Sequence, residues 1–218
     1  MNIAERALAE LFPEKKEERT IIVKYSRAFS DYNANVKFST STIQFRLSYK
    51  WKEVSDEIKV GLIQMFLLKI YNEKKNTINI ELYEKFIKHM STYAVKNQSD
   101  PILEESFKRV NEKYFNGFIE QPNLKWSNQN FRKLGSYEYV TDTITISNIF
   151  EKEKELLDYI MYHECLHKKL KYYSKNGRSF HHTTLFREME KKFDNPQIEK
   201  KLNEFLRKLR MRNLFKFW

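Results

Sequence analysis

The chain has 218 residues, of which 41% are hydrophobic and 15% aromatic, so it can bury a substantial core and is not a disordered chain. Gly and Pro number only 4 each, which favours long regular elements and short loops. The net charge of +11 favours polyanionic partners, and the single cysteine, Cys165, excludes an intrachain disulfide and fits a reducing compartment.

The sequence pattern of the first half of the chain predicts both helices and strands. Apolar residues at helical spacing predict a helix over 1–12, β-formers predict strands over 20–28 and 34–49, and further helices are expected over 54–71 and 81–93. Glu5, Glu10 and Glu14 interrupt the N-terminal segment 1–18, so this segment is not expected to be a signal peptide. The apolar run 60–71 is too short to cross a bilayer, and we expect a cytoplasmic protein.

Residues 96–101 form a polar segment that ends in Pro101, a residue that favours the first turn of a helix. We therefore expect a boundary here, with an N-terminal α+β region of unknown role over 1–98 and a second domain over 99–218. The second domain predicts a helix to residue 114, strands over 123–127, 135–140 and 143–147, and helices over 152–175, 181–193 and 197–213. Asn176-Gly177 is the predicted end of the first of these last three helices.

The most informative motif is H-E-x-x-H, formed by His163, Glu164 and His167 in the predicted helix 152–175. Residues four apart on a helix point the same way, so the two imidazoles can bind one Zn²⁺. Glu164 lies about 100° round the helix, where it can reach a water without occupying a coordination position. Cys165 is expected to be a small packing residue. The motif predicts a metal-dependent hydrolase.

A catalytic zinc usually has three protein ligands, so a third is needed. Phe186, Met189 and Phe193 lie four, seven and eleven residues after His182, which places His182 on the inward face of the predicted helix 181–193. His182 is therefore the predicted third ligand. The alternative is a carboxylate from the same helix, Glu188 or Glu190.

An ordered series of segments resembles the SprT-like (Spartan-type) zinc metallopeptidases over about residues 101–195. The segments are Ser106–Gly117, Leu124–Ser127, Leu134–Tyr137, Thr143–Ser147, the H-E-x-x-H helix, and His182-x-x-x-Phe186. The resemblance implies an α+β, zincin-like catalytic domain with a small mixed sheet, with His163, His167 and His182 as zinc ligands and Glu164 as general base. His182-Thr183 stands where the family usually shows His-Gly.

The two halves of the chain share an order of elements, strands followed by a long helix and a short one. A shift of 99 residues takes Leu47-Ser48 to Ile146-Ser147, and takes Gln64 and Leu68 to the two motif histidines. The first half is therefore interpreted either as a degenerate copy of the second or as an unrelated scaffold, in both cases without a metal.

The hypothetical mechanism is peptide hydrolysis by a metal-activated water, with Glu164 taking the water proton and passing it to the leaving amine. Strand 143–147 is expected to be the sheet edge, to which an extended peptide could add. Nothing in the sequence chooses the donor to the oxyanion among His181, Tyr172, Tyr173 and Arg178.

The C-terminal segment 197–218 is basic and amphipathic. The segment contains seven Lys or Arg residues and only two acidic residues, and aromatic residues are interleaved with them. This favours contact with DNA or RNA, and the alternative is a solvated basic face. Two functions follow: a zinc endopeptidase, by resemblance one acting on DNA-bound or DNA-crosslinked protein, or a nucleic-acid-binding or scaffold protein with a structural or vestigial zinc site.

Overall fold

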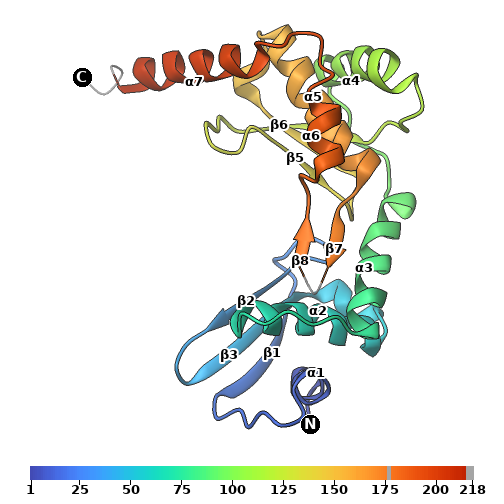
Figure 1. Ribbon diagram of the computed structural model, residues 1–218, viewed down its shortest axis with the longest axis vertical. Coiled ribbons are helices and arrows are strands. Elements are labelled where there is room, and N and C mark those ends of the chain that lie inside the picture. Colours follow the sequence, from blue (N-terminus) through green and yellow to red (C-terminus); the bar gives the residue numbers. More distant parts are fainter. Residues whose placement is uncertain (176–177, 215–218) are drawn as a thin grey trace. The chain divides into compact units, whose positions relative to one another are not determined.

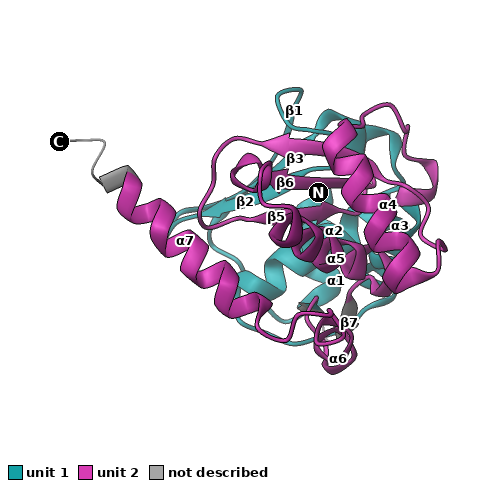
Figure 2. Cartoon of the chain, turned by 90° about the horizontal axis from the view of Figure 1, so that it is seen from above, with its two compact units in different colours: residues 1–90, 173–180 teal, residues 91–172, 181–218 magenta. Residues whose placement is uncertain are grey.

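The computed structural model describes residues 1–175 and 178–214, with the side chains of all of these except 173–175, 178, 179, 213 and 214. The chain forms two compact units. Unit 1 comprises residues 1–90 and 173–180, and unit 2 comprises residues 91–172 and 181–218 (Figure 2). None of the described helices is long and apolar enough to cross a membrane.

Unit 1 is a three-stranded sheet covered on one face by helices (Figure 1). Its elements are α1 (Ile3–Leu11), β1 (Thr20–Ser26), β2 (Ala34–Phe38), β3 (Thr42–Ser48), the 3₁₀ turn η1 (Tyr49–Glu53), α2 (Asp56–Ile70), α3 (Ile78–Met90) and the hairpin β7 (Tyr173–Lys175) and β8 (Arg178–Phe180). The strand order is β1–β3–β2, with β1 parallel and β2 antiparallel to β3. Apolar side chains of α1, β3 and α2 form the core, because alternate residues of β3 point to the covered face.

Unit 2 repeats this plan, with longer helices directly before and after the sheet. Its elements are the 3₁₀ turn η2 (Ser91–Tyr93), α4 (Pro101–Phe115), β4 (Asn123–Ser127), β5 (Gly135–Glu138), β6 (Thr143–Ser147), the 3₁₀ turn η3 (Asn148–Phe150), α5 (Lys154–Leu170), α6 (Thr184–Glu190) and α7 (Ile198–Leu214). The strand order is β4–β6–β5, with β4 parallel and β5 antiparallel to β6. Helices α4 and α5 contribute most of the core against β6. The predicted α+β class, with a small mixed sheet beside the motif helix, is confirmed.

Polar contacts fix α5 at both ends. Asp158 in its first half accepts hydrogen bonds from both Arg109 Nε (3.0 Å) and Arg109 Nη2 (2.8 Å), and one from Ser106 Oγ (2.6 Å), all from α4. Lys168 in its last turn donates to both oxygens of the fully buried Asp142, at 2.6 and 2.5 Å, and Lys96 also pairs with Asp142. A helix held at both ends keeps the side chains between them in a fixed orientation.

Three predictions about this region are wrong. Helix α5 ends at Leu170, not near residue 175, because Lys171 adopts a positive φ of 54° and the chain enters the β7–β8 hairpin. Asn176-Gly177, the predicted end, lies outside the described residues. The helix after the hairpin begins at Thr184 rather than at His181. Finally, β6 is the central strand and not the sheet edge, since β4 and β5 pair with it on either side.

Candidate metal centre

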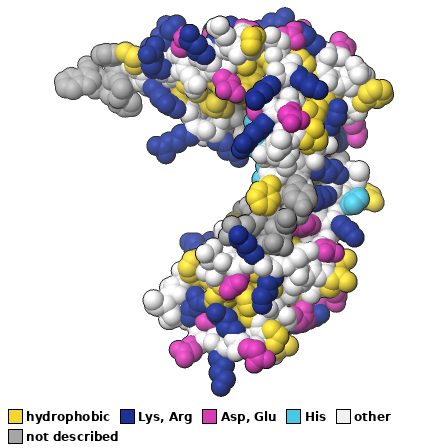
Figure 3. Space-filling model, viewed as in Figure 1, with side chains coloured by type: hydrophobic (Ala, Val, Ile, Leu, Met, Phe, Trp, Pro, Cys, Tyr) yellow, Lys and Arg dark blue, Asp and Glu magenta, His cyan; other side chains and the backbone are white. Residues whose placement is uncertain are grey.

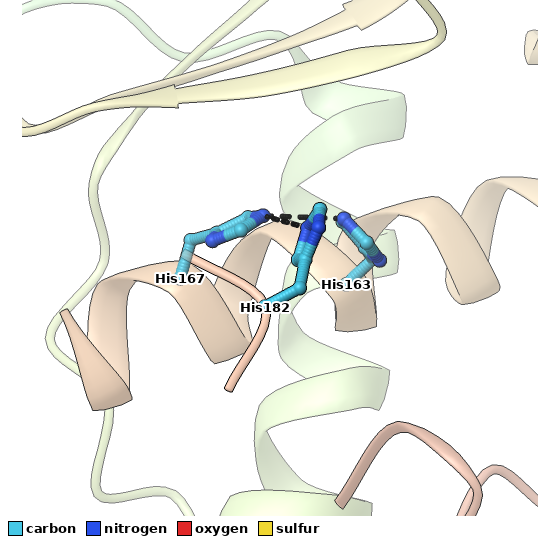
Figure 4. A group of neighbouring side chains, drawn as sticks. All are labelled: His163, His167 and His182. Atoms are coloured by element: carbon cyan, nitrogen blue, oxygen red, sulfur yellow. Dashed lines mark hydrogen bonds between the residues drawn. The ribbon is translucent and has the colours of Figure 1, made fainter. Parts of the chain in front are cut away.

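His163 and His167 lie one turn apart on α5, and their rings point to the same side of the helix (Figure 4). The opposite face of α5 is buried, and Cys165 is fully buried there as a packing residue, as predicted from its place between the histidines. His163 and His167 are themselves only half-buried. The helix therefore presents two imidazoles from a rigid support, at a place that solutes can reach.

His182 completes a group of three histidines. It lies in the turn before α6, where the Thr183 side chain caps the helix by accepting a hydrogen bond from Phe186 N (3.2 Å). The Nε2 atom of His167 lies 3.2 Å from that of His163 and 3.2 Å from that of His182 (Figure 4). Among the described residues, this is the group of histidine, cysteine and carboxylate side chains close enough to hold a metal ion.

The geometry of the three nitrogens fits a tetrahedral ion. Zinc–nitrogen distances of about 2.05 Å at tetrahedral angles place the ligand nitrogens about 3.3 Å apart. A neutral ring nitrogen has either one hydrogen or one lone pair, so His167 Nε2 cannot form two good hydrogen bonds to its two neighbours. A cation at the centre satisfies all three nitrogens. The donor set therefore fits Zn²⁺, with room for a fourth ligand.

A carboxylate contacts Nδ1 of His163, the ring nitrogen that does not point to the other two histidines. Glu190, at the end of α6, is 2.6 Å from His163 Nδ1 through Oε1. An acceptor at Nδ1 fixes the ring orientation and leaves Nε2 with its lone pair for a metal. Glu190 consequently cannot share an ion with Nε2 of the same ring. The other carboxylate weighed as a ligand, Glu188, is exposed and is not part of the group.

Glu164 is 3% exposed and lies against the outer strand of the sheet. A β-carbon placed on Gly135, at the start of β5, would be 2.5 Å from Glu164 Oε1 and 2.8 Å from Ile160 Cγ2, so glycine is required for this close approach. Glu164 Oε2 is buried without a hydrogen-bond partner among the described side chains and backbone. The edge strand beside the motif is thus β5, not the strand 143–147 expected from the sequence.

Burial sets the charge states of the site. Desolvation raises the pKa of Glu164 to about 7. Desolvation, and then the neighbouring histidines, lower the pKa of His167 to about 3, and desolvation also lowers the pKa of His182. For His163, burial works against the charged form, but the hydrogen bond to Glu190 and the charges of Glu164 and Glu190 together outweigh it and raise the pKa. Neutral His167 and His182 are in the form that binds metal ions.

Aromatic side chains border the histidines. The Tyr139 ring lies edge-on to Tyr172 with centroids 5.2 Å apart, and 6.2 Å from the His181 ring, which in turn lies 6.2 Å from that of His167. Of the predicted flanking residues, His181 and Tyr172 are therefore beside the site, whereas the side chains of Tyr173 and Arg178 lie outside the described part. Tyr139 was not among the site residues predicted from the sequence. Gly135, Tyr137 and Tyr139 are two residues apart in the predicted strand 135–140, so their side chains are expected on one face of it. Its hydroxyl is buried with no hydrogen-bond partner among the described groups.

Residues 103–205 match the model of the SprT-like family. Over these residues the chain is similar to the SprT-like family. The resemblance predicted over about residues 101–195 is confirmed, and the matched segment contains the whole histidine group and Glu164. Among solved structures, the chain is similar to the metallopeptidase zymogen jannalysin of Methanocaldococcus jannaschii, at 19% identity and a TM-score of 0.38, over 51% of this chain and 99% of that one. A comparison with curated proteins gives no match.

Proposed function

We propose that the protein is a zinc-dependent endopeptidase. The observation that carries the proposal is the convergence of three imidazole nitrogens, 3.2 Å from one to the next, beside a buried glutamate that is not one of the ligands. A purely structural zinc site has no need of such a glutamate. The match of residues 103–205 to the SprT-like family supports the same reaction class.

The residues have distinct roles in this proposal. His163, His167 and His182 hold the ion, which when bound lowers the pKa of a water molecule towards about 7 and polarises a carbonyl group. Glu164 accepts the proton of the attacking water and delivers it to the leaving amine, a role that suits a carboxylate with a raised pKa. The free edge of β5, beside Glu164, offers main-chain groups to an extended peptide. Tyr139 is the candidate donor to the oxyanion.

The proposed substrate is protein bound or crosslinked to DNA. The net charge of +11 supports attraction to a polyanion. Helix α7 packs its apolar side chains against unit 2, as in the ring contact of Phe205 with Phe150, and leaves its basic side chains exposed: Lys200, Lys201, Arg207, Lys208, Arg210 and Arg212. Lys and Arg side chains are also spread over the visible face of both units (Figure 3). The aromatic residues at 215–218 lie outside the described part.

The proposed reaction is tested with Glu164→Gln, using zinc content and cleavage of casein or of the protein itself. The variant should bind zinc like the parent but lose activity by a factor of at least about a hundred, because the proton acceptor is gone. Retained activity would exclude the mechanism. Stimulation of the parent by single-stranded DNA would support the DNA-bound substrate, and its absence would restrict the proposal to proteolysis.

The second candidate is a nucleic-acid-binding or scaffold protein in which the histidines hold a structural zinc. The exposed basic face of α7 favours it. Zinc binding without cleavage of any protein, with or without DNA, would decide for this alternative.

A further inference from the structure

The two units share one core plan. In each, a helix (α1 or α4) precedes a three-stranded sheet whose central strand is the third in sequence, and a 3₁₀ turn and a long helix (α2 or α5) follow that strand (Figure 1). In each sheet the first strand is parallel and the second antiparallel to the centre. This combination of order and sense in both sheets is the topology expected of a duplicated core.

The agreement extends to single hydrogen bonds. Ser48 and Ser147 are the last residues of the two central strands, and both are buried. Ser48 N donates to Asn33 O at 2.8 Å, and Ser147 N donates to Leu134 O at 2.9 Å, each just before the antiparallel strand. The first residues of those strands, Ala34 and Gly135, then pair at equivalent places, one residue before each serine. The register of the two sheets is therefore the same.

Unit 1 lacks the metal centre at the equivalent place on α2. The shift that takes Ser48 to Ser147 puts Gln64, Met65 and Leu68 where α5 has its two histidines and its glutamate. All three are buried. Gln64 accepts a hydrogen bond from Thr77 Oγ1 at 2.5 Å and donates to Ala7 O at 3.5 Å, so its amide is part of a closed network. Unit 1 has the architecture of the catalytic core without its chemistry.

The strand β2 corresponds to β5, and among the described residues no strand pairs with its outer edge. Ser39 N donates to Thr42 O at 2.8 Å, which marks the residue pairs that bond directly across β2 and β3. By alternation, Asn35 and Lys37 direct their main-chain groups to β3, whereas Val36 directs its own to the free edge. Tyr137 has the matching place on β5, next to Glu164. A free edge of this kind can bond an added strand.

The face of this sheet opposite the core is cationic, with one cation on each strand and Lys37 on the edge strand β2 itself. Lys24, Lys37 and Arg46 lie on the face of the sheet opposite the core, and Lys24 pairs with Arg46 across β1 and β3. The three strands contain no Asp or Glu. Within the described part of the chain, none of the three cations enters a salt bridge, and Arg46 lies over the Phe29 ring at 4.9 Å. An added strand with acidic side chains would complement this face.

We propose that unit 1 is a metal-free copy of the catalytic core, and that the free edge of β2 binds an extended acidic polypeptide by strand addition without cutting it. The bound segment would be a stretch of the substrate away from the cleavage site, and in that respect the proposal rests on the proposed function. Binding itself requires neither zinc nor Glu164, which makes the two proposals separable.

The test is fluorescence anisotropy of the full chain with a labelled peptide of alternating Glu and Val, in a His163→Ala/His167→Ala background. That background removes the metal centre, so peptide held there would be lost. We expect binding to persist. Val36→Pro removes one outward N–H and should weaken binding about fivefold, the effect of one hydrogen bond, whereas Val36→Ala keeps the N–H and controls for lost packing.

Charge and main-chain bonding are tested separately. Lys37→Glu leaves the fold untouched, since the side chain is exposed, and should weaken the acidic peptide while improving binding of a Lys/Val peptide. An acidic peptide N-methylated at alternate residues should not bind. Loss of binding in the histidine-free background, or equal binding by the parent, Val36→Pro and Lys37→Glu proteins, would overturn the proposal whatever the outcome of the cleavage assays.

Discussion

The contact between Glu190 and His163 gives the most specific prediction about the metal centre. Glu190 Oε1 is 2.6 Å from His163 Nδ1, on the side of the ring away from the other two histidines. Charge-assisted hydrogen bonds of this length are among the strong ones, and an acceptor on a ligand histidine raises the basicity of its metal-binding nitrogen. Removing the carboxylate should weaken zinc binding although no ligand has been touched.

Loss of such a partner costs 10- to 100-fold in metal affinity, or about 1.4 to 2.7 kcal/mol. We expect Glu190→Ala to show a loss in this range, measured as the zinc dissociation constant by competition with a chromophoric chelator. Glu190→Gln should lose less, because an amide oxygen still accepts the Nδ1 hydrogen but has no charge. Thermal unfolding of the zinc-free proteins should be compared in parallel, to show that the variants fold.

The matched control is Glu188→Ala, which removes an exposed carboxylate two residues away on the same helix. Its zinc affinity should equal that of the parent. If Glu188→Ala loses zinc and Glu190→Ala does not, the third ligand is a carboxylate and His182 is not part of the site. If neither variant changes the affinity, the contact with His163 does not support the metal centre, and the reasoning from ring orientation is refuted.

Three further predictions concern other parts of the molecule. Gly135→Ala places a methyl group against the Glu164 carboxylate and should lower kcat/KM about a hundredfold with zinc content unchanged; full activity would show that the close approach is not needed. Tyr139→Phe should lower kcat about a hundredfold at unchanged KM and stability, if its hydroxyl donates to the oxyanion; an unaltered kcat would remove it from the mechanism. In unit 1, the hydrogen bond from Arg19 lowers the pKa of Glu17 to about 2, so this pair stabilises the fold above about pH 4.5 and the stabilisation is lost as the pH falls to about 2. Glu17→Gln should therefore lower the free energy of unfolding by about 2 kcal/mol at neutral pH, with a difference that disappears in acid, and a difference independent of pH would refute the assignment.

The sequence predicted helices and strands correctly where the residues of a single segment determine its structure. The proline of Asp100-Pro101 opens α4 with Asp100 as its cap, as expected from helix-start chemistry, and strands β4 and β6 have the predicted bounds. The predicted end of α5 was wrong because a single residue in an unusual backbone conformation can terminate a helix. Lys171 has a positive φ that no sequence rule assigns to lysine, whereas Gly177 matched such a rule and misled.

The site shows a similar division. The spacing of the H-E-x-x-H motif determines which way His163 and His167 point, so a helix pattern alone could predict them. His182 was predicted as a ligand from its place on an inward helical face. It lies instead in the turn before α6, and the path of the chain back to α5 brings it to the other two histidines. Which strand is the edge of a sheet, and which of Glu188 and Glu190 faces His163, depend on packing between distant segments, and alternation within one segment carries no information about either.

The turn that carries His182 has a consequence for the stability of unit 2. His182 lies 15 residues after His167, and the chain between them leaves α5, forms a hairpin and returns. Where a metal joins the two histidines, it closes this loop as a cross-link would, and closing a loop of such a length with a disulfide is worth about 3 kcal/mol. With one cysteine, the chain has no covalent means to do the same. The docking of α6 onto α5 would then depend on the free metal concentration. Loss of the metal would release the third ligand and the packing of α6 in the same step.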